Sequence, residues 1–259
     1  MTTKKFFIAC YIFIAHLIVS SPAQNVGWHT NIKSALKYPD KVIKLRCNNL
    51  DTLTWEISKF RNLEELDVSL SKITSLPKEI GDLHKLKRLK AWHCNLTSIP
   101  KEIGYLVNLT YLDLGENRIT ILPKEIGRLK YLKSLNLEAN RLQTLPKEIG
   151  FLTDLEYLDI HANFLTVLPP CIGDLHKLKV LILGGDYGGN PIKYLPYQLS
   201  NLHHLQSLIL KDCMISAVPE GILSMHSLRY VDLRGTPMTR EDLHIDKAMK
   251  KMEIVLDPK

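Results

Sequence analysis

The sequence has little of what marks a disulfide-stabilised, strongly charged or membrane-embedded protein. Cysteine occurs five times in 259 residues, and aromatic residues make up 7% of the chain. Lysine and arginine outnumber aspartate and glutamate by 34 to 27, so the net charge is only +7. An excess of this size is a weak indication of a nucleic-acid or anionic-lipid partner, and we expect neither. Beyond residue 20 there is no apolar run of the about 20 residues that a membrane-spanning helix requires.

Sequence patterns of catalysis and cofactor binding are missing as well. None of the ten histidines has a partner at the spacing of a metal-binding motif. The glycine-rich segment 184–189 lacks the Lys-Ser/Thr pair that follows the glycines of a phosphate-binding loop. We therefore expect no catalytic residues, no cofactor, no metal and no small-molecule substrate.

The first 23 residues resemble a secretory signal peptide. Two lysines precede the apolar stretch 6–20, and Ser21 and Ala23 place small residues where a signal peptidase cleaves. We expect residues 1–23 to be removed, which leaves a chain without a membrane span. An uncleaved anchor is the alternative, although the stretch is short for a transmembrane helix.

A repeat of 23 residues runs through most of the remaining sequence, with the pattern LxxLxLxxNxLxxLPxxIxxLxx. Its first leucine recurs at Leu63, Leu86, Leu109, Leu132 and Leu155. Extending the frame gives nine units over 40–238, and the first unit then contains Ile43, Leu45 and Asn48. The seventh unit has 27 residues because of the glycine-rich insert 184–189. Beyond the ninth unit, the frame predicts one more strand around Ile254.

The hexapeptide Leu-Pro-Lys-Glu-Ile-Gly at 76–81, 122–127 and 145–150 makes the repeat highly specific. The chain resembles leucine-rich-repeat proteins, in particular the 23-residue class of secreted bacterial proteins. It is also similar to plant and animal scaffold proteins associated with Ras-type signalling. The resemblance implies an α/β solenoid with a curved parallel β-sheet on the concave side and short helical or 3-10 turns on the convex side. It also implies a binding scaffold, whose ligand differs between members.

The repeat pattern predicts this architecture on physical grounds too. Each LxL triplet alternates apolar and polar residues, which is typical of a strand with its leucines on one face. One such strand cannot bury that face alone, whereas stacked units bury a continuous core. A proline follows the next apolar residue in most units, and proline fits the first position of a helical turn.

The asparagine three residues after the triplet is expected to point inward at each turn. Its amide can satisfy loop backbone groups that neither a sheet nor a helix pairs. We expect this row, the asparagine ladder, to consist of Asn48, Asn117, Asn140, Asn163 and Asn190.

The two open ends of the stack require caps, because a bare terminal core would be exposed. We expect an N-terminal helical cap over 24–39, with Ile32, Ala35 and Leu36 on its inner side. We expect a C-terminal capping helix and a terminal strand over 239–259.

Four cysteines would remain after removal of the signal peptide. Cys94 and Cys213 hold equivalent positions five units apart, which is about 24 Å at the usual strand spacing of about 4.8 Å. A disulfide requires Cα atoms within about 7 Å of each other. We therefore expect free thiols at these positions and at Cys47 and Cys171.

The polar residues that alternate with the core leucines are expected to form a binding surface on the concave face. Tyrosine, tryptophan and arginine dominate the energies of protein interfaces. We expect Trp92, Tyr111 and Tyr157 to be exposed anchors, with charged neighbours that set specificity. The alternative is that these residues only cover the sheet. The expected binding residues are Arg88, Lys90, Trp92, Tyr111, Asp113, Asn136, Glu138, Tyr157, Asp159 and His161.

Together these features predict a non-catalytic protein–protein interaction module that is secreted or held in the cell envelope. The alternative is an intracellular or membrane-tethered signalling scaffold. An enzyme would need a catalytic domain, and the repeats and caps leave no residues for one. The expected face has no continuous basic track, so the predicted partner is a protein and not a nucleic acid.

Overall fold

The computed structural model describes residues 27–239, 241–243 and 252–257. The expected signal peptide at 1–23 lies outside these described residues. So do residues 244–251, which form most of the expected C-terminal helix.

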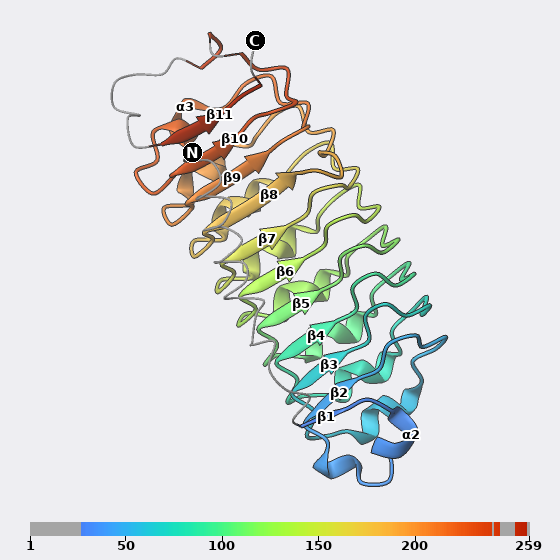
Figure 1. Ribbon diagram of the computed structural model, residues 1–259. Coiled ribbons are helices and arrows are strands. Elements are labelled where there is room, and N and C mark those ends of the chain that lie inside the picture. Colours follow the sequence, from blue (N-terminus) through green and yellow to red (C-terminus); the bar gives the residue numbers. More distant parts are fainter. Residues whose placement is uncertain (1–26, 240, 244–251, 258–259) are drawn as a thin grey trace.

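One parallel sheet of eleven strands runs along the described chain (Figure 1). The strands lie in sequence order, so every connection leads to the neighbouring strand. The strands are β1 Trp28–His29, β2 Lys44–Arg46, β3 Glu65–Asp67, β4 Arg88–Lys90, β5 Tyr111–Asp113, β6 Ser134–Asn136, β7 Tyr157–Asp159, β8 Val180–Gly184, β9 Ser207–Leu210, β10 Tyr230–Asp232 and β11 Glu253–Val255.

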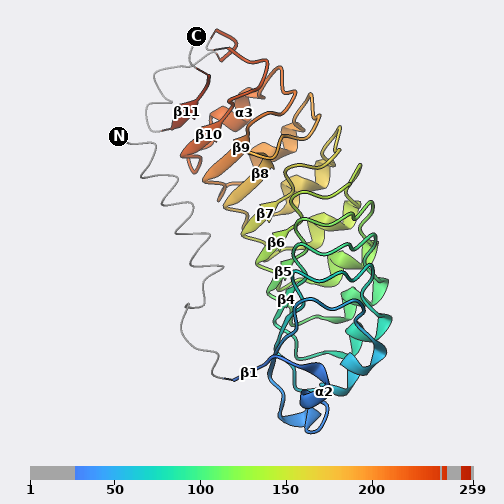
Figure 2. The same ribbon diagram turned by 45° about the vertical axis from the view of Figure 1, so that its right-hand side comes forward.

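Short helices lie on the opposite side of the solenoid from the strands (Figure 2). Most are single 3-10 turns, and this arrangement confirms the expected fold class. None of the described helices is long and apolar enough to cross a membrane. The helices are α2 Ile32–Ala35, η1 Pro39–Lys41, η2 Trp55–Lys59, η3 Lys78–Asp82, η4 Lys101–Tyr105, η5 Lys124–Arg128, η6 Lys147–Phe151, η7 Pro170–Asp174, η8 Tyr197–Asn201 and α3 Glu220–Leu223.

The repeated leucines form one continuous core between the sheet and the turns. The central leucines of β4 to β7 pair in register and are fully buried: Leu89, Leu112, Leu135 and Leu158. Burying one such side chain contributes about 1.5–3 kcal/mol. Because each leucine packs between two units, this stabilisation comes from stacking and not from any unit alone.

The glycine that ends the repeated hexapeptide lies where neighbouring 3-10 turns touch. A Cβ atom on Gly127 would lie 2.5 Å from the carbonyl oxygen of Glu148 in the next turn, and one on Gly104 would lie 2.6 Å from that of Glu125. The obstructing atom is backbone in both cases, so a side chain would force the turns apart. The hexapeptide needs glycine at this position for close stacking of the convex side.

We expect Gly127→Ala to lower the free energy of unfolding by about 1–3 kcal/mol, the usual range for overpacking an interior. Gly221→Ala in α3 is the control, because its Cβ would meet only the Ser200 side chain, at 3.2 Å. Urea unfolding of both variants checks this expectation. Wild-type stability of the Gly127 variant would show that the turns can separate without loss.

The N-terminal end contains a strand that the sequence pattern did not indicate. Helix α2 covers only Ile32–Ala35 and is capped by Asn31, whose side chain accepts a hydrogen bond from the backbone N–H of Ser34 at 3.0 Å. Before it, β1 pairs with β2, and the Arg46 guanidinium lies 4.5 Å from the centre of the Trp28 ring. Two residues are too few for a recognisable alternation, so this strand escaped detection.

The first repeat has a different register from the one that the 23-residue frame predicted. Leu45 pairs with Leu66, 21 residues further on, and Ile43 is 49% exposed. The inward pair of β2 is therefore Leu45 and Cys47, and not Ile43 and Leu45. Asn48 is exposed, so its assignment to the buried ladder is wrong. The physical reason is that the chain between β2 and β3 is two residues shorter than a regular unit.

The other four ladder asparagines are buried. The Asn140 side-chain oxygen accepts from the Ile119 N–H at 3.0 Å, and its amide donates to the carbonyl oxygens of Leu114, Leu137 and Glu138 at 2.9–3.1 Å. Asn117 and Asn163 make equivalent sets of bonds. Each asparagine thus ties together the backbone of consecutive units.

The glycine-rich insert leaves the sheet continuous. Leu181 pairs with Leu208, 27 residues later, and a bulge between Ile182 and Gly184 absorbs part of the extra length. Strand β8 remains paired with both β7 and β9. The insert therefore extends from the edge of the sheet where the strands end.

At the C-terminal end, β11 adds the last strand to the sheet. Val231 of β10 lies opposite Ile254. The Thr239 hydroxyl donates to the Asp242 carboxylate at 2.8 Å, in the part of the expected capping segment that is described.

Candidate functional site: the concave face

Polar side chains of β4 to β7 align in rows across the sheet, because the pairing register is regular. One row is Arg88, Tyr111, Ser134 and Tyr157, and the next is Lys90, Asp113, Asn136 and Asp159. Trp92, Glu138 and His161 follow β4, β6 and β7 by two residues. The structure thus brings all ten expected binding residues together on one part of the sheet.

Two of the expected anchors are not exposed. Tyr111 and Tyr157 are 4% and 6% exposed, so their assignment as exposed anchors is wrong. The Arg88 guanidinium lies 4.2 Å from the centre of the Tyr111 ring and covers it. Neighbouring strands stand only about 4.8 Å apart, so side chains within a row cover one another.

The tyrosines are instead part of a Tyr-x-Asp unit that recurs on three strands. The Tyr111 hydroxyl donates to Asp113 at 3.3 Å, and the Tyr157 hydroxyl donates to Asp159 at 3.0 Å. A third copy, Tyr230 with Asp232, has the same bond at 3.4 Å. Each hydroxyl fixes a carboxylate at the end of its strand, so these tyrosines help to position the carboxylates of the face.

Asp113 is a buried carboxylate at the centre of the face. It accepts hydrogen bonds from the Gly115 N–H at 3.3 Å and the Asn136 amide at 3.1 Å. Burial raises its pKa, although these bonds and the charge of Lys90 oppose the shift. The ionised form is therefore less favourable in the folded chain than in the unfolded chain.

We expect Asp113→Asn to increase stability more at pH 7 than at pH 4. A carboxyl group whose folded pKa is raised stabilises the fold below its unfolded pKa and loses that contribution as the pH rises through the folded pKa. Asparagine keeps an oxygen acceptor and cannot ionise, and Asn136 already holds the equivalent position in β6. Thermal midpoints of both proteins at the two pH values measure the difference. An equal change at both pH values would contradict a raised pKa.

A cluster of three titratable groups lies beside this centre. His161 Nδ1 is 2.7 Å from Asp159 Oδ1 and 3.8 Å from Glu138 Oε2. Burial lowers the pKa of His161, but the hydrogen bond and charge of Asp159, with the charge of Glu138, raise it overall. Burial and the charge of Asp159 raise the pKa of Glu138. These three residues offer ligand atoms within 4.8 Å of one another, a grouping that sequence spacing did not reveal.

The N-terminal end of the face is internally neutralised. Lys44 contacts Glu65 at 2.8 Å, and Arg46 contacts Asp67 at 3.2 Å. Arg88 lies 4.0 Å from Glu65. The bases in this part of the described chain are therefore balanced by carboxylates on neighbouring strands.

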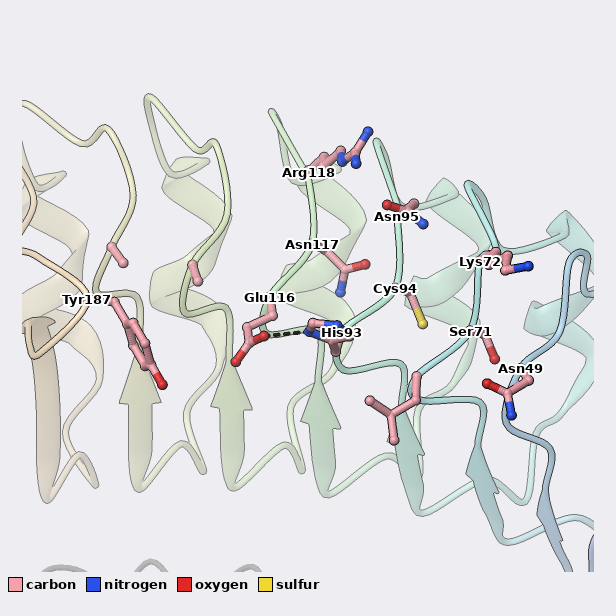
Figure 3. Close-up of a pocket in the computed structure, with 13 residues that line it drawn as sticks. Asn49, Ser71, Lys72, His93, Cys94, Asn95, Glu116, Asn117, Arg118 and Tyr187 are labelled. Atoms are coloured by element: carbon pink, nitrogen blue, oxygen red, sulfur yellow. Dashed lines mark hydrogen bonds and ion pairs between the residues drawn. The ribbon is translucent and has the colours of Figure 1, made fainter.

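A shallow groove of about 960 Å³ runs along the edge where the strands end (Figure 3). Its floor includes one left-handed residue from each of the first six units: Asn49, Leu70, His93, Glu116, Ala139 and Ala162. His93 and Glu116 form a 2.6 Å pair there. Tyr187 of the insert reaches the far end of the groove. Sequence reasoning missed this groove, because backbone conformation and not a residue type defines it.

The comparisons agree with the repeat. A family model described as a leucine-rich repeat region matches residues 94–186. No relative among curated proteins matches the sequence. Among solved structures, a leucine-rich-repeat protein of Leptospira interrogans is 32% identical, with a TM-score of 0.65 over 84% of this chain and 62% of the other. An internalin of Listeria monocytogenes is 22% identical, with a TM-score of 0.71 over 89% of this chain and 71% of the other, a likeness of fold alone.

A plant receptor is similar as well. The leucine-rich-repeat ectodomain of the membrane receptor kinase GASSHO1/SCHENGEN3 from Arabidopsis thaliana, in complex with Casparian strip integrity factor 2, is 26% identical. Its TM-score is 0.59, over 74% of this chain and 26% of the receptor. The chain spans less than two thirds of the length of the Leptospira and Arabidopsis proteins. Proteins of this fold are generally non-catalytic interaction scaffolds. The match of the repeat region and the likeness to the Leptospira structure thus agree with the register of the sheet: the chain contains a leucine-rich-repeat region and folds as a leucine-rich-repeat solenoid.

Proposed function

We propose that this protein is a secreted or cell-envelope interaction module of the bacterial 23-residue class, and that it binds a protein partner on its concave face. The observation that carries the proposal is the set of partly exposed side chains left at the centre of that face: Arg88, Lys90, Trp92, Asn136 and Glu138. The sheet holds their backbone positions at fixed spacing, so the surface is already arranged before a partner binds.

The charges of this set favour a protein over a nucleic acid. Arg88 and Lys90 lie at one side and Glu138 two strands away, so the surface has both signs. A nucleic acid would require a continuous basic track. The bases on β2 of the described sheet already contact Glu65 and Asp67, which leaves no such track there.

The similar receptor supports a protein or peptide partner. That ectodomain is seen in complex with Casparian strip integrity factor 2, and at 26% identity the analogy favours a proteinaceous ligand for this chain. The non-enzymatic role follows the same analogy.

Export is tested by determining the first residue of the protein isolated from its source. Mass spectrometry is expected to find a chain that starts near Gln24. An intact Met1 would contradict export and favour the alternative of an intracellular or membrane-tethered scaffold.

The binding face is tested by affinity capture with three baits: the full chain, Lys90→Glu and Lys147→Glu. The two variants make the same charge reversal, on strand β4 and on the convex turn η6 respectively. We expect the full chain and the Lys147 variant to capture the same protein, and the Lys90 variant to lose it. Capture that fails only with the Lys147 variant would place the interface on the convex turns.

A further inference from the structure

The repeat places two potential metal ligands at one position of successive units. Glu138 and His161 are 23 residues apart, and each follows its strand by two residues. Asp159 lies at the end of β7, two residues before His161. Stacking of β6 on β7 therefore brings an imidazole and two carboxylates side by side.

The ligand atoms already have nearly the separation that a metal ion requires. Bonds of about 2.0–2.2 Å in a tetrahedral site keep neighbouring ligand atoms about 3.4 Å apart. His161 Nδ1 is 2.7 Å from Asp159 Oδ1 and 3.8 Å from Glu138 Oε2. The first separation must widen and the second must shorten, each by less than about 1 Å. The third pair, the ligand oxygens of Asp159 and Glu138, lies within 4.8 Å. Rotation of the Glu138 side chain, which is 22% exposed, can supply the shortening, whereas the widening requires a small shift of the His161 or Asp159 side chain.

Surrounding groups hold the two buried ligands in place. The Tyr157 hydroxyl donates to Asp159 Oδ2 at 3.0 Å, and the backbone N–H of His161 donates to Asp159 Oδ1 at 3.2 Å. The Tyr187 ring stacks on His161, with centroids 6.3 Å apart and planes at 16°. Hydrogen-bonded and packed outer groups of this kind orient ligands in metal sites.

The insert is shaped to fit the imidazole. A Cβ atom on Gly185 would lie 2.9 Å from His161 Cδ2, so only glycine allows the insert to pass so close to the ring. The four extra residues of the seventh unit thus have a local role beside His161. No regular unit among those described supplies this cover.

We propose that Glu138, Asp159 and His161 bind one divalent transition-metal ion, with Zn²⁺ the best fit, and leave one coordination position open towards the concave face. An imidazole with two carboxylates and an open position is a set of ligands that Zn²⁺ accepts. The ion takes the place of the proton between His161 Nδ1 and Asp159, and that proton passes to the solvent. The site is independent of whether a protein partner binds nearby.

The chain contains a matched control for this site. His93 and Glu116 form an equally short pair of 2.6 Å on neighbouring units, but His93 is far more exposed and no third ligand from the described residues joins the pair. Substitutions in the cluster of Glu138, Asp159 and His161 should therefore abolish metal binding. Substitutions in the His93–Glu116 pair should leave it unchanged.

The test is titration of the untagged, chelator-treated full chain with Zn²⁺ by calorimetry, repeated with Co²⁺ by visible absorption. We expect one equivalent to bind, with a Co²⁺ spectrum typical of tetrahedral nitrogen and oxygen ligation. Affinity should fall at least tenfold in His161→Ala and in Glu138→Gln, and should not change in His93→Ala. If circular dichroism shows that the His161→Ala variant does not fold, the Glu138→Gln variant alone tests the cluster. Absence of saturable binding, or equal losses in the His93 and cluster variants, would overturn the proposal and leave the protein-binding role untouched.

Discussion

Asn140→Ala is expected to lower the free energy of unfolding by about 3 kcal/mol, because each buried backbone group left unpaired costs about 1–3 kcal/mol. The substitution removes the acceptor of the Ile119 N–H and the donor shared by three carbonyl oxygens. The Ile119 N–H is then left without an acceptor, whereas the carbonyl oxygens of Leu114, Leu137 and Glu138 lose one of two donors and keep the other. Urea unfolding monitored by circular dichroism gives the change.

Asn48→Ala is the matched control, because the same residue type there is exposed and makes one bond, to the carbonyl oxygen of Ser69 at 2.6 Å. Its effect should stay below about 1 kcal/mol. Similar losses in the two variants would show that burial in the ladder is not the source of the stabilisation.

Tyr157→Ala is expected to cost more, about 3–5 kcal/mol, which is the range for removing a large aromatic side chain from a core. The ring is 6% exposed, and its hydroxyl holds the Asp159 carboxylate. If the tyrosine were an exposed anchor, its replacement by alanine would instead reduce the affinity for the partner and leave the free energy of unfolding nearly unchanged.

Tyr157→Phe separates the contribution of the ring from that of the hydroxyl. We expect it to cost about 1 kcal/mol, the usual net value of one hydrogen bond. Thermal and urea unfolding of the two variants measure both effects. A Tyr157→Ala protein with wild-type stability would restore the tyrosine to the list of exposed contacts.

The fold was largely predictable, because a solenoid repeats one local pattern. The pairing of Leu89, Leu112, Leu135 and Leu158 follows from 23-residue spacing alone. The prediction was wrong at Ile43 and Asn48, where a two-residue shortening of the first unit leaves the leucine pattern recognisable but shifts the register. Strand β1 was missed because two residues contain no periodic pattern.

The positions of the site residues on the sheet were predictable from the sequence, but their exposure to solvent was not. Register alone placed Tyr111 and Asp113 on the concave face, since polar and apolar residues alternate along a strand. Whether a ring in such a row is open depends on neighbours in three dimensions, and Arg88 covers Tyr111. Likewise, the distance between His161 and Glu138 is a property of two stacked units and not of sequence spacing.

The most direct test of the concave binding face compares two variants, each of which truncates one exposed or partly exposed aromatic side chain. The quantity measured is the affinity of each variant for the captured partner. Trp92 follows β4 on the sheet side, whereas Phe151 ends the convex turn η6 and is 57% exposed. Surface plasmon resonance should show that Trp92→Ala weakens binding at least tenfold, because buried aromatic contacts dominate interface energies. Phe151→Ala should bind like the wild type. Unchanged affinity of the Trp92 variant, together with a loss in the Phe151 variant, would contradict binding on the concave face.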